Sequence, residues 1–240
     1  EMYGYLKNDM LLVDVVRTNQ EAFGRIGMKQ PDVRELLDMT CGDTDTWRMY
    51  AEGHTMGLNQ VEQEKTREKV MRYKPKNITE LAAFVAAVRP AFKSMLPIFL
   101  DRRHFDYGIP AFDKLIQTRE MTSSFLLYQE QTMKTLQFAG FSAPESYSAI
   151  KAIAKKHPEK VLPLKTRFLE GFAAKADMPS AEKVWQIIED ATSYGFNSSH
   201  AVCVALDSLY GAWLKAHHPL EYYTTLLSCY ADKGDKDRIS

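Results

Sequence analysis

The strongest chemical signal in the sequence is a run of basic side chains between residues 151 and 167. Lys151 and Lys155 are four residues apart, so they share a face if the segment is helical. Such a cluster can neutralise several phosphates, which gives affinity for nucleic acid without base preference. A solvated helix face is the alternative explanation, and charge alone does not separate the two. Against the single acid Glu159, the basic residues are Lys151, Lys155, Lys156, Lys160, Lys165 and Arg167.

Closely spaced aspartates are the second candidate for chemistry. Asp43 and Asp45 have the Asp-x-Asp spacing that can hold a metal ion in phosphoryl transfer, and Asp9 precedes them. Asp43 also stands just before Trp47 and Tyr50, where an aspartate caps the start of a helix. We favour the capping role. A nuclease that uses these three aspartates is a further hypothesis, and it requires magnesium-dependent cleavage that an Asp9→Ala variant loses.

The chain that positions these residues is predicted to be mainly helical. β-Branched and aromatic residues between positions 3 and 16 predict one or two short strands. Apolar residues recur at helical spacing over most of the remaining chain. Asn77 predicts the start of one helix that ends before Pro90, and Pro219 predicts the first turn of another. The expected fold is therefore mainly α and multi-helical, with a short β element at the N-terminus.

Composition limits the classes of function. The chain has 240 residues, of which 45% are hydrophobic and 26% charged, and this is typical of a soluble globular protein. Lys+Arg and Asp+Glu both count 31, so any nucleic-acid contact must come from a local patch. The cysteines Cys41, Cys203 and Cys229 lack metal-ligand spacing and indicate a reducing cytoplasm. Charges interrupt the longest apolar stretch, 81–100, so no membrane span is predicted.

Longer motifs resemble a known protein family. Residues 193–201 have the sequence Ser-Tyr-Gly-Phe-Asn-Ser-Ser-His-Ala, and residues 212–219 have Ala-Trp-Leu-Lys-Ala-His-His-Pro. Both are similar to segments of the alpha (catalytic) subunits of bacterial DNA polymerase III, the C-family replicative DNA polymerases. Residues 127–133 and 149–159 resemble further blocks of the same subunits, in the same order.

The resemblance implies a division of the chain. Residues 1–35 are expected to be the C-terminal edge of a palm domain, and residues 36–240 a multi-helical fingers domain. Ile150 and Lys151 stand where the family has an Arg pair, and Ser198 where it has a lysine. Since lysine lacks the bidentate geometry of arginine, we expect a divergent, for example phage-encoded, member with a weaker hold on phosphates.

The resemblance also implies an activity and the residues that serve it. It implies a DNA-directed DNA polymerase, a nucleotidyltransferase that acts in DNA replication through a two-metal Mg²⁺ mechanism. Asp9 is the implied catalytic and metal-binding residue. Because the other palm aspartates of the family precede Glu1, the fragment alone is expected to be inactive. The implied nucleotide-binding residues are Lys151, Lys155, Lys156, Ser199 and His200, although His200 could simply meet a backbone partner at its helix start. The DNA-binding candidates are Arg102, Arg103 and Lys160, and a solvated surface is the alternative for the arginine pair.

The partners that follow are template-primer DNA and deoxynucleoside triphosphates. For the intact protein the resemblance adds a sliding clamp, a proofreading exonuclease subunit and a clamp loader. The alternative is a non-catalytic helical nucleic-acid-binding or scaffold protein that retains the fingers fold. An Asp-x-Asp pair upstream in the parent gene would favour the polymerase, whereas a natural start near Glu1 would favour the scaffold. Tyr194 and Phe196 flank a glycine turn and could position the next helix N-terminus, which is a natural anion site.

Overall fold

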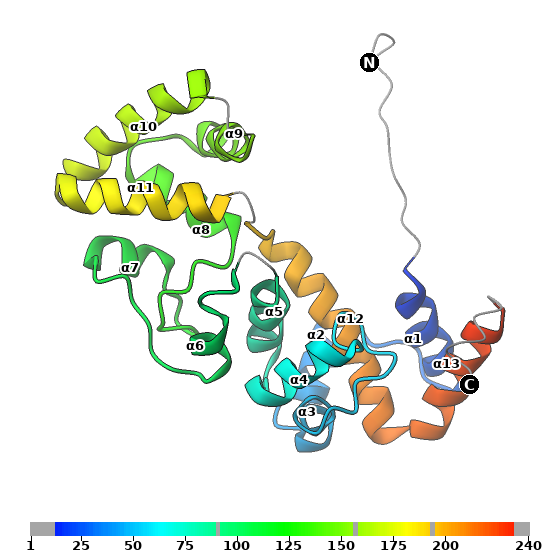
Figure 1. The fold of residues 1–240 in the computed structure, drawn as a ribbon. Helices are drawn as coiled ribbons and strands as arrows, with labels where there is room; N and C mark the ends of the chain where they lie inside the picture. The colour runs from blue at the N-terminus through cyan, green and yellow to red at the C-terminus, as the bar shows by residue number, and fades with distance from the viewer. Residues whose placement is uncertain (1–12, 90–91, 156–157, 193–194, 233–240) are drawn as a thin grey trace, which may run out of the picture.

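The helices of this chain gather into two lobes (Figure 1). The computed structural model describes residues 13–89, 92–155, 158–192 and 195–232. Within these ranges the chain forms thirteen helices, and its only β pairing is an isolated parallel bridge between Tyr128 and Phe196. The prediction of a mainly α fold is confirmed. No helix in the described ranges is long and apolar enough to cross a membrane.

The first lobe is built from the beginning and the end of the described chain. α12 runs through it and packs against α1, α3, α5 and α13. Phe23, Tyr50, Phe84 and Tyr222 are fully buried in its core. Its helices are α1 (Asp14–Arg25), α2 (Val33–Thr40), α3 (Thr44–Ala51), α4 (Glu64–Tyr73), α5 (Ile78–Ala87), α6 (Leu96–Leu100), α12 (Ser198–His217) and α13 (Pro219–Asp232).

The second lobe is built from the middle of the chain. Phe168, Phe172 and Trp185 are fully buried in a separate core. A Cβ atom on Gly171 would lie 1.9 Å from the carbonyl oxygen of Ala139, so only glycine allows α10 to pack this closely on the end of α8. The helices of this lobe are α7 (Pro110–Ile116), α8 (Gln129–Phe138), α9 (Ala143–Ala154), α10 (Pro158–Ala173) and α11 (Met178–Thr192).

Local sequence signals explain where several helices begin. The Asn77 side chain accepts a hydrogen bond from the Glu80 N–H at 2.9 Å, and α5 ends before Pro90, as predicted. Glu80 does not complete a capping box with Asn77, because its carboxylate accepts a hydrogen bond from the N–H of Lys76. Pro219 is the first residue of α13, also as predicted. Residues that pre-set the backbone or satisfy free amides thus fix helix starts without tertiary help.

The predicted strand is wrong where the structure describes it. Residues 14–16 belong to α1, and residues 1–12, with the expected palm-like segment, lie outside the described residues. α1 buries Thr18, Asn19, Ala22 and Phe23, which recur at the spacing of one helix face. Val13 and Val16 stay exposed. β-Branched residues at an exposed helix start produced a strand-like pattern that the burial of the following turns overrides.

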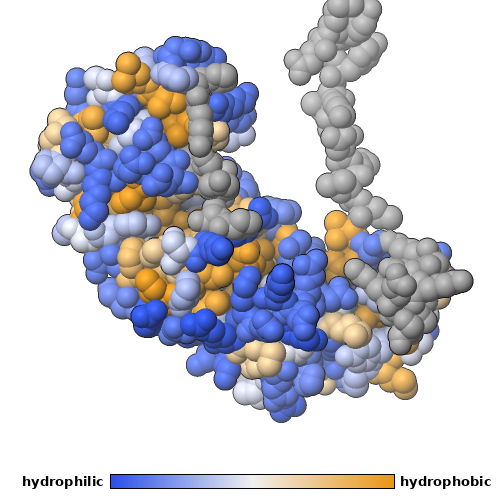
Figure 2. Space-filling model, viewed as in Figure 1, coloured by the Kyte–Doolittle hydropathy of each residue, from blue (hydrophilic) through white to orange (hydrophobic). Residues whose placement is uncertain are grey.

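The two lobes meet through connecting segments. In the described part of the chain, the extensive helix–helix contacts all lie within one lobe or the other. Residues 101–109 lead from α6 into the second lobe, and residues 195–197 lead into α12 of the first. Residues 117–128 connect α7 to α8 within the second lobe and contribute Phe125 and Leu127 to the core of the first. Figure 2 shows apolar side chains gathered in the middle of this face, between the lobes. The junction is therefore the place where parts of both lobes face one another.

Candidate nucleic-acid interface

The predicted lysines lie on the surface of the second lobe. Lys151 and Lys155 end α9, Lys160 lies in the first turns of α10, and all three are exposed. Ile150 and Ile153 are buried, so the core side of α9 directs the lysines outward. None of the three lysines forms an ion pair within the described ranges. Lys156 lies outside these ranges.

Lys151 and Lys155 have few contacts with neighbouring residues. The Lys151 ammonium lies 4.2 Å from the centre of the Tyr147 ring, a cation–π contact on the surface. Lys155 caps the C-terminus of α9, where the helix dipole favours a positive charge. Both contacts leave the amines accessible. The cluster can therefore meet phosphates, and it can equally remain a solvated helix face.

The start of α12 carries the other two predicted nucleotide-binding residues. The Asn197 side chain accepts the His200 N–H at 2.9 Å and caps the helix. Ser199 and His200 are exposed. The Ser198 N–H donates to both carboxylate oxygens of Glu130, at 3.1 and 3.2 Å. A carboxylate thus already meets the first amide of α12, so an incoming anion would have to use side chains or displace Glu130.

An aromatic stack joins this helix start to Arg89, which follows α5. The Arg89 guanidinium lies 3.5 Å from the centre of the Phe196 ring, and the His200 ring meets the same ring edge-on at 5.2 Å. Phe196 is held in place by its bridge to Tyr128. Sequence patterns alone assign no function to Arg89. Only the pairing of residues 128 and 196, which are distant in sequence, brings these groups together.

The two predicted DNA-binding arginines differ in their surroundings. Arg102 donates to the carbonyls of Tyr73 and Lys74 and to both oxygens of Glu80, at 2.6–2.9 Å. The hydrogen bond to Glu80 raises the pKa of Arg102. Arg103 is more exposed, with Asp101 3.7 Å away. Arg102 is thus committed to the fold of the first lobe, whereas Arg103 has free donors.

The structure does not bring all predicted residues into one site. Lys151, Lys155 and Lys160 belong to the second lobe, Ser199 and His200 lie where α12 leaves the junction, and Arg102 and Arg103 follow α6 in the first lobe. No hydrogen bond, ion pair or ring contact between described residues links one of these groups to another. They are three separate groups of exposed polar residues.

Metal ligands are missing from the part of the chain that the structure describes. No group of three His, Cys, Asp or Glu residues is placed there to hold a metal ion, and Asp9 lies outside it. Asp43 caps α3 and meets the His217 ring at 2.7 Å. Burial opposes ionisation of Asp43, but hydrogen bonds from Thr46 and His217 outweigh it and lower the pKa of this carboxyl. The favoured capping role of Asp43 is confirmed.

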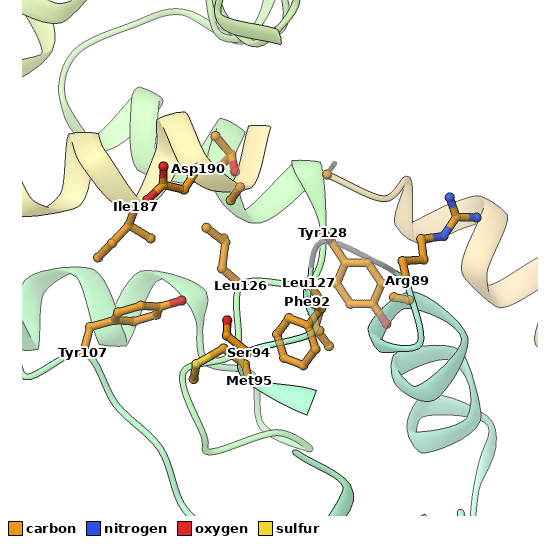
Figure 3. A pocket seen from close by; sticks show the side chains of 14 residues that line it. Arg89, Phe92, Ser94, Met95, Tyr107, Leu126, Leu127, Tyr128, Ile187 and Asp190 are labelled. Carbon is orange, nitrogen blue, oxygen red and sulfur yellow. The ribbon is translucent and has the colours of Figure 1, made fainter. Parts of the chain in front are cut away.

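A cleft of about 240 Å³ opens where the lobes meet (Figure 3). Its walls come from both lobes and from the segments between them. Burial raises the pKa of Tyr107 and of Tyr128 to about 12, so both phenols stay neutral. We call it the interlobe cleft; the residues that line it include Arg89, Phe92, Tyr107, Leu126, Tyr128 and Asp190.

The described residues thus define a two-lobed helical module with exposed lysines on one lobe and a cleft where the lobes meet. Comparison with known proteins gives its family. The sequence model for the bacterial DNA polymerase III alpha subunit finger domain matches residues 14–176, and the chain belongs to this family. The resemblance predicted from the motifs is confirmed.

Curated relatives agree with this assignment. The chain is 34% identical to the DNA polymerase III subunit alpha of Campylobacter jejuni over 207 residues, which cover 84% of this chain and 17% of the relative. It is 30% identical to that of Bacillus subtilis over 243 residues, covering 100% and 22%. For Thermotoga maritima the identity is 34% over 191 residues, covering 79% and 22%. The chain thus spans about a fifth of the length of these relatives.

Proposed function

We propose that the chain is the fingers region of a DNA-directed DNA polymerase that binds template-primer DNA and the incoming deoxynucleoside triphosphate during DNA replication. Family membership supports the class of protein. The observation that carries the binding role is the set of exposed lysines on α9 and α10, which have no carboxylate partner among the described residues. A cluster without internal partners keeps its charge available for phosphates.

The residues of this chain would supply binding and not bond making. Lys151, Lys155 and Lys160 would neutralise phosphates, while Ser199 and His200 offer a hydroxyl and an imidazole beside the junction. Nucleotidyl transfer by the parent protein needs Mg²⁺ held by carboxylates, and the one implied in this chain, Asp9, lies outside the described residues. The sliding clamp, proofreading exonuclease subunit and clamp loader are proposed partners of the intact protein only.

Binding to a labelled primer-template duplex across a salt series tests the proposal. A variant with Lys151→Gln, Lys155→Gln and Lys160→Gln is compared with a control in which the exposed lysines Lys65, Lys114 and Lys134 become Gln. Each variant loses the same charge, so a general charge effect cancels. We expect the first variant alone to lose affinity and to lower the salt slope by roughly 2–3 units. Equal losses in both, or none, would contradict the proposal.

A further inference from the structure

Three arginines of the described residues stack on aromatic rings, and one of them differs from the others. Arg102 lies over Tyr73 and is paired with Glu80, and Arg167 lies over Phe141 and is paired with Glu145. Arg89 lies over Phe196 but forms no ion pair and donates no hydrogen bond within the described ranges. Its cation is held in place without being neutralised.

The stacking geometry leaves the donors of Arg89 usable. A guanidinium that lies on a ring uses its flat face, whereas its five N–H donors point outward in the guanidinium plane. Stacking also restricts the side chain before any ligand arrives, so less rotamer entropy is lost on binding. Arg89 is thus pre-oriented for a bidentate contact. Partial burial lowers the pKa of Arg89, as expected for a cation that lacks a carboxylate partner.

The position of Arg89 puts this free cation beside the predicted nucleotide-binding residues. It follows α5 at the edge of the first lobe, and Figure 3 shows its side chain extending towards the start of α12. Phe196 connects it to His200, and the interlobe cleft opens next to it. The cations of the proposed cluster on the second lobe, Lys151, Lys155 and Lys160, are point charges and cannot grip a phosphate with two parallel hydrogen bonds.

We propose that Arg89 binds a phosphate group at the mouth of the interlobe cleft, stacked on Phe196 with its N–H donors facing the ligand. The proposal rests on the proposed function and adds a residue that the sequence motifs did not assign. The phosphate can belong to a nucleoside triphosphate or to the DNA backbone. In both cases the contact holds the ligand at the mouth of a cleft that residues of both lobes line.

Binding measurements on the 240-residue chain distinguish the two sources. The probes are inorganic tripolyphosphate, dATP and a primer-template duplex of fixed sequence. The variants are Arg89→Gln, which removes the charge, Arg89→Lys, which keeps the charge without the fork, and Arg34→Gln. Arg34 is an exposed arginine of α2 and has no ion pair in the described part, so it is a matched control.

We expect Arg89→Gln to weaken binding of at least one probe about tenfold or more. Arg89→Lys should recover part of this loss. Arg34→Gln should bind every probe as the wild type does. A loss with tripolyphosphate and dATP identifies the triphosphate. A loss with the duplex alone, with a salt slope lower by about one unit, identifies the DNA backbone. Circular dichroism and melting curves of Arg89→Gln show whether the variant remains folded, and recovery by Arg89→Lys excludes a purely structural loss.

Unchanged binding of every probe by Arg89→Gln would overturn the inference. If the triple lysine variant still loses affinity in that case, the proposed function stands without Arg89. If the wild type binds none of the probes, the proposed function itself fails, and the inference fails with it. The two failures therefore give different results.

Discussion

The two lobes are assembled in different ways, although both are helical. The second lobe uses one continuous stretch, and its core joins α7 to α11. The first lobe is complete only when α12 and α13 return to pack against α1, α3 and α5. One lobe can therefore form from local contacts, whereas the other depends on residues more than a hundred positions apart. The proposed phosphate-binding lysines lie on the lobe that is local.

The buried hydrogen bonds of the two lobes show the same difference in sequence separation. In the first lobe, the Tyr210 hydroxyl donates to the Pro31 carbonyl at 2.8 Å, and the Lys215 ammonium donates to the carbonyls of His54 and Met56 at 2.7 and 2.8 Å. In the second, the Gln131 side chain donates to the Ile116 carbonyl at 2.7 Å and accepts the Leu127 N–H at 2.8 Å. In these buried contacts, the partners in the first lobe are far apart in sequence, whereas those in the second lobe are near one another.

Separating the lobes is the strongest test of this comparison. We expect a fragment of residues 104–192 to fold by itself, because its core is complete. A fragment of residues 13–103 should not fold, since it lacks α12 and leaves Phe23 and Phe84 uncovered. Circular dichroism and urea unfolding measure both. An unfolded 104–192 fragment would contradict the conclusion that the second lobe forms from local contacts. A cooperatively folded 13–103 fragment would contradict the conclusion that the first lobe requires α12.

Gly171 offers a test within the second lobe. The Cβ atom of a Gly171→Ala variant would meet the backbone of Ala139, which cannot rotate away, so we expect a loss of about 3 kcal/mol in the free energy of unfolding. Gly24 is the matched control, because it lies in α1 with open space around its Cβ position. Gly24→Ala should gain up to about 1 kcal/mol from helix propensity. Urea titrations of both variants give the values, and equal effects would contradict the close packing.

Lys215 makes the first lobe sensitive to pH. Burial lowers the pKa of its ammonium to about 8, below the roughly 10.4 of an unfolded lysine. Between these values the unfolded chain binds a proton that the folded chain has released, so stability rises with pH. We expect the wild type to gain up to about 2 kcal/mol relative to Lys215→Met between about pH 8 and 10. Urea unfolding at several pH values measures this difference, and parallel curves would show that Lys215 does not titrate in this range.

The sequence predicted the helical class and several helix starts because those depend on neighbouring residues. Asn77 and Pro219 act on the backbone next to them. The sequence could not predict the two lobes, since which apolar faces share a core depends on tertiary packing. For the same reason, the sequence predicted a DNA contact for Arg102 and no function for Arg89. The partner of each arginine is a residue distant in sequence. Glu80 pairs with the charge of Arg102, whereas Phe196 only stacks on Arg89.

Arg102 gives the smallest expected effect and sharpens the contrast with Arg89. Its guanidinium is partly exposed, so solvent weakens the pair with Glu80, and we expect Arg102→Ala to cost about 1 kcal/mol of unfolding free energy at neutral pH. Burial of Glu80 favours its neutral form, but hydrogen bonds from Arg102 and Lys76 outweigh this and lower the pKa of the carboxyl.

Because the folded pKa of Glu80 lies below its unfolded value, the contribution of the pair is present above about pH 4.3 and lost as the pH falls through the folded pKa. The stability difference between wild type and Arg102→Ala should therefore shrink in acid, while affinity for a primer-template duplex stays unchanged. A variant that kept its stability and lost duplex affinity would instead support a phosphate contact by Arg102. In that case, the availability of N–H donors would not distinguish a DNA-binding arginine from a structural one in this chain.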